Sequence, residues 1–382
     1  DPWLLAQLGT ALKNSPRAEV ETGGCLWTER LRCLFLGVAR RLKWSLRMKR
    51  GFFVQLAHWL TQPGSAPRDG ILIYSHLVPR SLKPGGGWED PFLNGLDTEL
   101  AAEGIASSRL TYLDITGFEA EVARRKGYLL PAILWWSFGG YLRALATLPP
   151  ALPSDSKLSG LPVGRLLERE WWQDFARAGR CAYLFFFDCV ENLLSKSSFK
   201  AVAMPWEAQP QERMLVLAAQ RAGVRCVGYQ HTTVPEFQLP FYSTAEEYRN
   251  SPTPDILVTS GEHPASVLRS AGFPAQRLRM GGTRRYGHFL KDGAFPRPSL
   301  GPDVLIMLPV DAWQARHLIA AVARAYPDGL PEGRFLLRPH PSGPEDVRRT
   351  PFPSELAEGP MNEALSRCGV VVFSGSTAGL DA

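Results

Sequence analysis

"KAVAMPWEAQPQERMLVLAAQRAGVRCVGYQH" (residues 200–231) is the stretch of sequence that decides the fold. It begins with a mostly apolar run that predicts a short buried strand. Residues 209–222 then have the spacing of a helix, and "RCVGYQH" (225–231) predicts a second strand. A strand, a helix and a strand in this order form a βαβ unit, whose two strands lie parallel in one sheet. The sequence therefore predicts an α/β domain with a parallel sheet.

The same alternation continues on both sides of this stretch. Further strands are expected at 69–77, 109–115, 254–261 and 277–282, and further helices at 93–104 and 263–272. These elements indicate a first Rossmann-like domain over residues 69–290. Residues 291–302 are rich in proline and glycine and are interpreted as a linker.

The pattern restarts beyond the linker, over residues 303–382. Strands are expected at 303–310, 334–341 and 369–376, with helices at 311–326 and 354–367. A Rossmann-like unit usually has more elements than these, so we expect a fragment whose C-terminal domain is incomplete. The fold class predicted is α/β, with two Rossmann-like domains that face a ligand-binding cleft.

The composition is typical of a globular protein with anionic partners. The chain has 382 residues, 45% of them hydrophobic and 21% charged, with a net charge of +6. A pI near 9.0 favours a nucleotide, an acidic glycan or a membrane surface as partner. No recognised nucleic-acid-binding motif is present, so we expect no nucleic-acid partner. The six cysteines have no CxxC spacing, which indicates reduced thiols in a cytoplasmic protein.

Residues 1–68 form a basic N-terminal segment that precedes the first domain. Within it, 27–61 has a helical pattern with basic residues at the polar positions. We expect a pair of solvated helices that pack on the body, and the alternative is a peripheral anchor to anionic lipid. Residues 127–148 are the most apolar. Because a proline, an internal Gly-Gly pair and an arginine interrupt them, they predict a buried helix and not a membrane span.

Two strand ends of the second domain have residues that suit a bound phosphate. One strand ends in "RPHP" (338–341) and another in "SGST" (374–377). Small residues let backbone N–H groups approach an anion, hydroxyls donate hydrogen bonds, and a helix N-terminus adds positive potential. An ordinary helix cap is the alternative for the serines and threonine. The candidate residues are Arg338, His340, Pro341, Ser374, Gly375, Ser376 and Thr377. No Asp-x-Asp follows a strand, so we expect no metal ion.

Two neighbouring strands of the first domain end in residues that suit catalysis. Glu207 follows one strand and His231 ends the next, and adjacent parallel strands would bring them together. A carboxylate held by an imidazole can act as a base or as a nucleophile on a sugar carbon. The structural alternatives are a helix-start carboxylate for Glu207 and a core histidine for His231. Asp188, a carboxylate in an apolar run, is a rival catalytic candidate.

The segment "GGTRRYG" (281–287) lies near the expected crossover between the domains. Arg284 and Arg285 within it could clamp a carboxylate or a phosphate with paired N–H groups. A surface arginine pair is the alternative interpretation.

These motifs, in this order, resemble the bacterial surface-carbohydrate glycosyltransferases of GT-B fold. More narrowly, they are similar to the enzymes that use CMP-activated ulosonic acids, the Kdo transferases and sialyltransferase-like enzymes. That family has an HP motif, matched by His340-Pro341, and a serine- and threonine-rich motif, matched by 374–377. The resemblance covers roughly residues 200–382. The acidic pair that the family usually has before a glycine is not evident.

The resemblance implies transfer of a Kdo-like or sialic-acid-like sugar from its CMP donor to a lipopolysaccharide or capsule glycan. The N-terminal domain would be the acceptor side and the C-terminal domain the CMP-donor side, with no cofactor. Arg284 or Arg285 would bind the donor carboxylate. Glu207 would act as nucleophile in a retaining reaction or as base in an inverting one. The expected place is the cytoplasm, with peripheral contact at the inner membrane through the basic helices.

Two alternative functions belong to different classes. One is a polyol-phosphate transferase that uses a CDP-glycerol-type donor, which would need charge for two phosphates. The other is a non-catalytic nucleotide-binding scaffold of glycan assembly, in which Glu207 and His231 would be replaceable.

Overall fold

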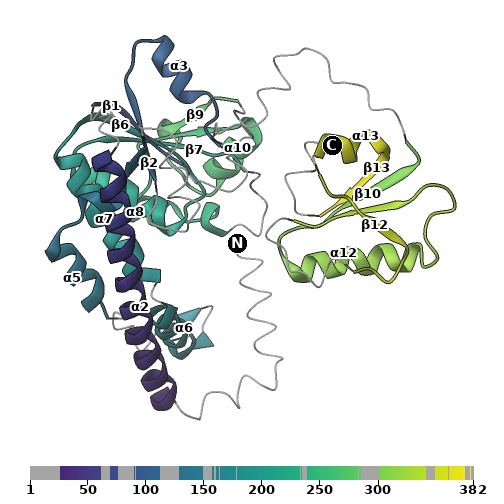
Figure 1. Ribbon diagram of the computed structural model, residues 1–382, viewed down its shortest axis with the longest axis horizontal. Helices are drawn as coiled ribbons and strands as arrows, with labels where there is room; N and C mark the ends of the chain where they lie inside the picture. The colour runs from purple at the N-terminus through teal and green to yellow at the C-terminus, as the bar shows by residue number, and fades with distance from the viewer. Residues whose placement is uncertain are drawn as a thin grey trace. The chain divides into compact units, whose positions relative to one another are not determined.

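A computed structural model of the protein gives two compact units, residues 1–287 (unit 1) and 288–382 (unit 2). The residues it describes are 26–61, 69–75, 90, 92–111, 129–148, 157–158, 161–162, 164–177, 179–232, 234, 239–282, 284, 301–340, 349–359, 361–374 and 379. Figure 1 shows the ribbon of each unit.

Seven of the described strands of unit 1 form one parallel sheet. In sheet order they are β3 (Leu129–Pro131), β2 (Ser107–Thr111), β1 (Asp69–Tyr74), β6 (Ser198–Pro205), β7 (Arg225–Tyr229), β8 (Ile256–Thr259) and β9 (Leu278–Met280). The order runs outward from β1 in one direction and from β6 in the other. The position between β1 and β6 is therefore the topological switch point of a Rossmann-like sheet. A separate antiparallel pair joins β4 (Lys157–Leu158) and β5 (Leu161–Pro162).

The helices of unit 1 connect and cover these strands. The α-helices are α2 (Leu26–Thr61), α3 (Leu96–Ala102), α5 (Phe138–Ala146), α6 (Gly164–Arg177), α7 (Gly179–Ser195), α8 (Pro210–Arg221), α9 (Ala245–Asn250) and α10 (Glu262–Ser270). The 3-10 helices are η2 (Ala132–Trp135), η3 (Leu239–Phe241) and η4 (Ala275–Arg277). The long helix α2 runs along one side of the unit (Figure 1).

Apolar residues fill both faces of the unit 1 sheet. On β1, Leu72 and Tyr74 belong to the larger core, together with Phe185 and Phe186 of α7. Ile73 points to the opposite face, where it packs with Leu93 and Tyr229. Because both faces are covered, the strands read as continuous apolar runs in the sequence. This is why the sequence predicted them.

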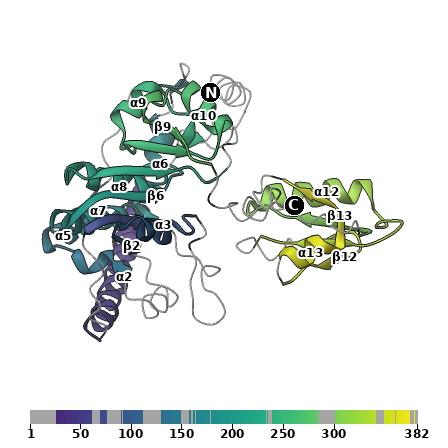
Figure 2. The same cartoon turned by 90° about the horizontal axis from the view of Figure 1, so that it is seen from above.

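Unit 2 repeats the arrangement on a smaller scale. Its described strands form a four-stranded parallel sheet in the order β12 (Ser354–Leu356), β11 (Phe335–Arg338), β10 (Asp303–Met307) and β13 (Cys368–Phe373). Two cores lie on the two faces: α12 (Ala312–Ala325) packs on one and α13 (Met361–Arg367) on the other (Figure 2). The α/β class and the two Rossmann-like parallel sheets agree with the prediction.

Three local predictions differ from the structure. Residues 27–61 form one continuous helix and not a pair, because no proline interrupts the pattern. Residues 127–148 are not one helix: Pro131 ends β3, and α5 begins only after the cap residue Ser137. A helix was expected at 354–367, but the first residues of this range form the strand β12, and the helix α13 begins only at Met361. Most of the predicted linker 291–302 lies outside the described residues.

The buried cysteines give a prediction about thiol reactivity. Burial raises the pKa of the Cys181 thiol to about 11, and it also raises the pKa of Cys226. We expect both to react with a maleimide about a hundredfold more slowly in the native protein than in guanidinium, because the thiolate is the reactive form. The half-buried Cys33 is the internal control. Peptide mass spectrometry measures each rate, and equal rates at Cys181 in the two states would contradict the prediction.

Candidate functional site

The candidate site of unit 1 lies where β6 and β7 end, next to the topological switch point. Pro205 of β6 is paired with Tyr229 of β7. Glu207 and His231 each follow their paired residue by two positions, so the shared register carries both to the same edge of the sheet. Open α/β sheets bind ligands at this edge, outside the carboxyl ends of the strands.

Glu207 and His231 are in direct contact. His231 Nε2 lies 3.1 Å from Glu207 Oε1, and the side chains are 3% and 22% exposed, respectively. The sequence-based prediction that these two strand ends bring the pair together is confirmed. The carboxylate of Glu207 therefore reaches solvent, whereas the imidazole of His231 contacts it from the buried side.

A tight turn positions Glu207 between β6 and α8. Ala208 has a φ of 58°, in the left-handed region that residues other than glycine rarely adopt. The buried carboxylate of Glu212 accepts hydrogen bonds from the backbone N–H of Glu207 (2.7 Å) and of Gln209 (3.0 Å). Backbone strain of this kind persists only where the surroundings fix it, and it is concentrated at functional sites. Glu212 therefore fixes the turn that presents Glu207.

His231 is held by its ring contacts and by its neighbour in the chain. Its ring packs edge-to-face with that of Phe92, with ring centroids 4.5 Å apart. The buried Gln230 side chain accepts hydrogen bonds from the backbone N–H of Ser260 (3.0 Å) and from its hydroxyl (2.9 Å), which ties the end of β7 to the end of β8. Within the described part of the chain, Nδ1 of His231 is buried and has no hydrogen-bond partner.

A buried ionic network, which the sequence analysis did not predict, supports Phe92. The Asp90 carboxylate accepts hydrogen bonds from the Ser75 hydroxyl (2.7 Å) and from the backbone N–H groups of Phe92 (2.8 Å) and Leu93 (2.9 Å). Arg109 of β2 forms a salt bridge with it. The network therefore holds Phe92 where its ring contacts His231. Its one sequence signal is the motif "WEDPF" (88–92), an acid and a proline directly before an aromatic residue.

Arg284, a candidate for a donor carboxylate, lies beside the end of β7. Its backbone N–H donates to the Tyr229 hydroxyl (2.6 Å), and its guanidinium donates to the carbonyl of Asn94 (3.2 Å) and pairs with Glu99 of α3. An incoming carboxylate would compete with Glu99, whose side chain is exposed. Arg285 lies outside the described residues.

Asp188, the rival catalytic candidate, is bound by partners of its own. Its carboxylate accepts from the backbone N–H (3.1 Å) and hydroxyl (2.9 Å) of Ser137, the cap of α5, and from Arg143 (3.0 Å). A Cβ at Gly140 would lie 1.9 Å from its carboxyl carbon, so Gly140 is needed for this close approach. Asp188 thus clamps α5 to α7. Among the described residues, the hydrogen-bond partners named for it do not include Glu207 or His231.

In unit 2, part of the predicted phosphate site is described. Met307 of β10 is paired with Arg338 of β11 on one side and with Phe373 of β13 on the other. Arg338 and Ser374, which follows Phe373, therefore reach the same edge of the sheet, and the half-buried His340 follows β11. Arg338 donates to the carbonyls of Ala357 (3.1 Å) and Gly359 (2.9 Å), so its guanidinium also fastens the segment after β12.

The other predicted phosphate residues, Pro341, Gly375, Ser376 and Thr377, lie outside the described residues. Among the residues that the structure describes, no three His, Cys, Asp or Glu side chains gather as metal ligands.

Known proteins resemble this chain only distantly. A scan against models of protein families finds no match, and a search of curated proteins finds no significant match. Among solved structures, the chain is similar to a UDP-N-acetylglucosamine 2-epimerase from Rickettsia bellii, with a TM-score of 0.43 and 11% identity over 80% of this chain and 73% of that one. It is also similar to Anabaena HepE in complex with UDP and glucose, with a TM-score of 0.40 and 10% identity over 79% and 73%.

A third similar structure is a putative UDP-N-acetylglucosamine 2-epimerase from Listeria monocytogenes, with a TM-score of 0.42 and 10% identity over 81% of this chain and 75% of that one. At these TM-scores the likenesses say nothing about substrate or reaction.

The clamp formed by Asp188 gives a prediction about stability. We expect Asp188→Ala to lower the free energy of unfolding by about 3 kcal/mol, because it leaves the Ser137 N–H without its buried acceptor and removes the partner of Arg143. Guanidinium unfolding measures the change. Asp174→Ala, at an exposed position of α6, should change it by less than about 0.5 kcal/mol. Equal stability of the two variants would contradict the clamp.

The turn after β6 gives a second prediction. Glu212→Ala should lower the free energy of unfolding by about 2 kcal/mol, because two backbone N–H groups lose their acceptor. Glu262→Ala is the matched control, since Glu262 is an exposed glutamate in the first turn of α10, and we expect a change below about 0.5 kcal/mol. A small effect of Glu212→Ala would show that the turn forms without its carboxylate.

Proposed function

We propose that the protein is a glycosyltransferase that moves a sugar from a nucleotide donor, with Glu207 as the reacting carboxylate. The supporting observation is the contact between Glu207 and His231 at the carboxyl edge of the unit 1 sheet. A partly exposed carboxylate on a strained turn, held by a buried imidazole, is suited to act on a sugar carbon or on an acceptor hydroxyl. His231 is then a positioning residue, because its ring is buried.

For the donor, we propose a CMP-activated ulosonic acid, as the sequence motifs of unit 2 imply. His340 and the residues 374–377 would bind the single phosphate of CMP, and Arg284 or Arg285 would bind the donor carboxylate. A lipopolysaccharide or capsule glycan is the proposed acceptor. A single phosphate ester needs less charge than a diphosphate, and hydroxyls with a histidine can stabilise it as it leaves without a metal ion.

The chemistry proposed is a double displacement. A Glu207 oxygen bonds to the anomeric carbon as the bond from that carbon to the phosphate oxygen breaks, and CMP leaves. The acceptor hydroxyl then bonds to the same carbon, its proton passes to solvent, and Glu207 departs as a carboxylate. Two inversions give net retention. Inversion in the product would instead make Glu207 the base that takes the acceptor proton.

Nucleotide binding tests the donor. Calorimetric titration of the protein with CMP, CDP, UMP and UDP in EDTA should show micromolar binding of CMP and much weaker binding of the uridine nucleotides. His340→Ala should weaken CMP binding about tenfold or more, because it removes a side chain that donates a hydrogen bond to the phosphate. Preference for CDP would favour the polyol-phosphate alternative, and preference for UDP would overturn the CMP assignment.

Turnover tests the reacting carboxylate. With a CMP-ulosonate and a glycan acceptor, we expect Glu207→Gln to lower kcat by at least about a thousandfold while CMP binding is unchanged. Glu262→Gln, an exposed glutamate at another helix start, is the matched control and should keep wild-type turnover. Near-normal turnover of Glu207→Gln would show that Glu207 is not the reacting carboxylate and would favour the non-catalytic scaffold.

A further inference from the structure

The exposed face of α2 carries an apolar stripe that the fold of unit 1 does not use. Large hydrophobic side chains recur along it at spacings of three, four or seven residues, which places them on one face of the helix. They are Leu31, Leu34, Phe35, Val38, Leu42, Leu46, Phe53 and Leu60. Phe35 is 75% exposed and Leu46 is 68% exposed. The exposed Lys49, seven residues after Leu42, lies within the row. Single exposed apolar residues are normal, but a row of this length marks an interaction surface.

A different face of α2 attaches the helix to unit 1. Arg41 donates to the carbonyl of Leu145 (2.6 Å), Met48 lies in the larger core, and the ring of Trp44 meets Phe185 edge-on. The apolar stripe is therefore additional to the packing face. The ring of Phe52, on the packing face, contacts Trp136 before α5.

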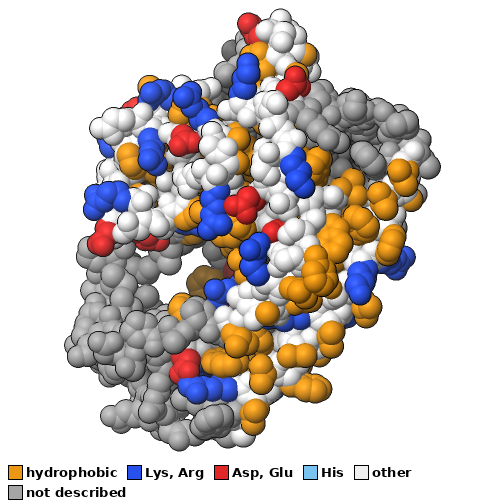
Figure 3. Space-filling model, turned by 90° about the vertical axis from the view of Figure 1, so that its left-hand side faces the viewer, with side chains coloured by type: hydrophobic (Ala, Val, Ile, Leu, Met, Phe, Trp, Pro, Cys, Tyr) orange, Lys and Arg blue, Asp and Glu red, His pale blue; other side chains and the backbone are white. Residues whose placement is uncertain are grey.

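Basic residues lie beside the apolar stripe, on the side away from the packing face of α2. The helix has eight Lys or Arg and a single acidic residue, Glu29. Exposed Arg32, Lys43 and Arg50 lie about 80–120° around the helix from the apolar row at 100° per residue. Figure 3 shows hydrophobic side chains gathered in a band along the side of the molecule that carries α2, with Lys and Arg beside it.

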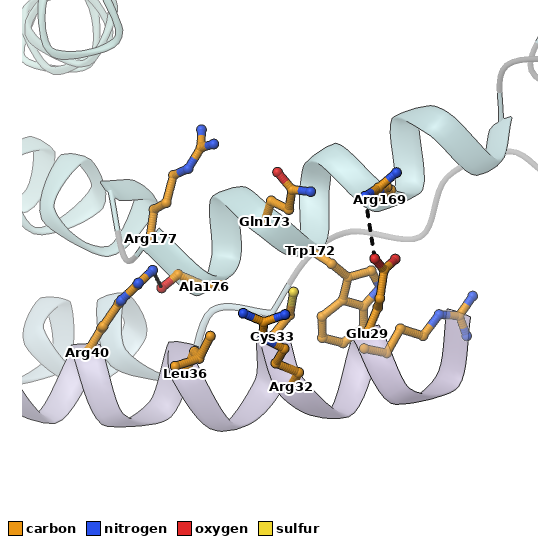
Figure 4. A pocket seen from close by; sticks show the side chains of 11 residues that line it. Glu29, Arg32, Cys33, Leu36, Arg40, Arg169, Trp172, Gln173, Ala176 and Arg177 are labelled. Atoms are coloured by element: carbon orange, nitrogen blue, oxygen red, sulfur yellow. Dashed lines mark hydrogen bonds and ion pairs between the residues drawn. The ribbon is translucent and has the colours of Figure 1, made fainter. Parts of the chain in front are cut away.

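Arginines of α2 and α6 meet in one pocket between the two helices. Arg32 and Arg40 of α2 and Arg169 and Arg177 of α6 line a pocket of about 290 Å³ between the two helices (Figure 4). Glu29, the one acid of α2, is paired there with Arg169 (3.5 Å). Arginines from both helices thus line this pocket, and Glu29 is paired among them.

We propose that α2 binds the surface of an anionic membrane, lying in the plane of the interface. The apolar row would enter the boundary between headgroups and acyl chains, and the lysines and arginines beside it would meet lipid phosphates. At 36 residues the helix is about 54 Å long. None of the described helices, α2 included, is long and apolar enough to cross a bilayer. Membrane binding through α2 goes beyond the proposed function and does not depend on it.

Charge decides between a membrane and a second copy of this chain. Two α2 helices packed through their apolar rows would bring two basic flanks together with one acid on each helix, and like charges at close range destabilise such a pair. An anionic lipid surface supplies the opposite charge along the whole helix.

Flotation of the full chain with lipid vesicles tests the proposal. We expect binding to vesicles of phosphatidylcholine with phosphatidylglycerol, much weaker binding to phosphatidylcholine alone, and loss of binding as salt is raised. The double variant Phe35→Gln/Leu42→Gln should lower the partition coefficient at least about tenfold. Lys43→Glu/Arg50→Glu should lower it by about fivefold or more per residue on anionic vesicles.

Two controls match these variants. Trp313→Gln removes a large side chain that is 65% exposed on α12, and Lys196→Glu reverses an exposed charge after α7. Both should bind vesicles as the wild type does. Thermal unfolding checks that every variant folds, which we expect because the substituted side chains are exposed.

Three results would overturn the proposal. The first is a wild-type chain that does not float with anionic vesicles. The second is a Phe35→Gln/Leu42→Gln variant that floats as well as the wild type. The third is a wild-type dimer in sedimentation velocity that this variant converts to a monomer while neither protein binds vesicles, which would make the stripe an interface between copies. CMP titration of the same variants separates this failure from failure of the proposed function.

Discussion

The site of unit 1 depends on one buried carboxylate, that of Glu212. A parallel strand that ends at the sheet edge must turn sharply into its helix, and the turn leaves backbone N–H groups without partners. Glu212 accepts from two of them, at Glu207 and Gln209. With both satisfied, Ala208 can stay in a left-handed conformation that would otherwise be unfavourable. The direction of the Glu207 side chain follows from that turn, and so does its contact with His231.

Burial separates the carboxylates that the sequence could not rank. Asp188 and Glu207 both follow apolar residues, and in the sequence each could serve as a reacting group. In the structure Asp188 is almost fully buried and accepts hydrogen bonds from an N-cap residue and an arginine. A carboxylate satisfied in this way stabilises the structure. Glu207 keeps part of its surface exposed, so it remains available to a ligand.

The predictable part of the fold follows from short-range patterns. Strands buried on both faces are apolar throughout, and the helices between them have their own period, so β6, α8 and β7 could be placed from residues 200–231 alone. Their common register then implies that Glu207 and His231 meet. The contact of Phe92 with His231 and the Asp90–Arg109 salt bridge were not predictable, because they join segments far apart in the chain through side chains that no local period encodes. For the same reason Arg338 was predicted to face a phosphate, whereas its guanidinium is also engaged with two carbonyls.

The sequence of α2 contains two sets of apolar residues, and the structure places them on different faces of the helix. A helix that packs on a domain needs one apolar face, and α2 satisfies that need with Trp44, Met48 and Phe52. The second apolar row, from Leu31 to Leu60, is therefore not explained by folding, since burying it adds nothing to the core of unit 1. A glycan acceptor carried on a lipid is confined to a membrane surface. An enzyme held at that surface meets such an acceptor at a higher effective concentration than one free in solution. Membrane binding through α2 would therefore favour a reaction with a glycolipid acceptor. The two proposals are tested by separate experiments.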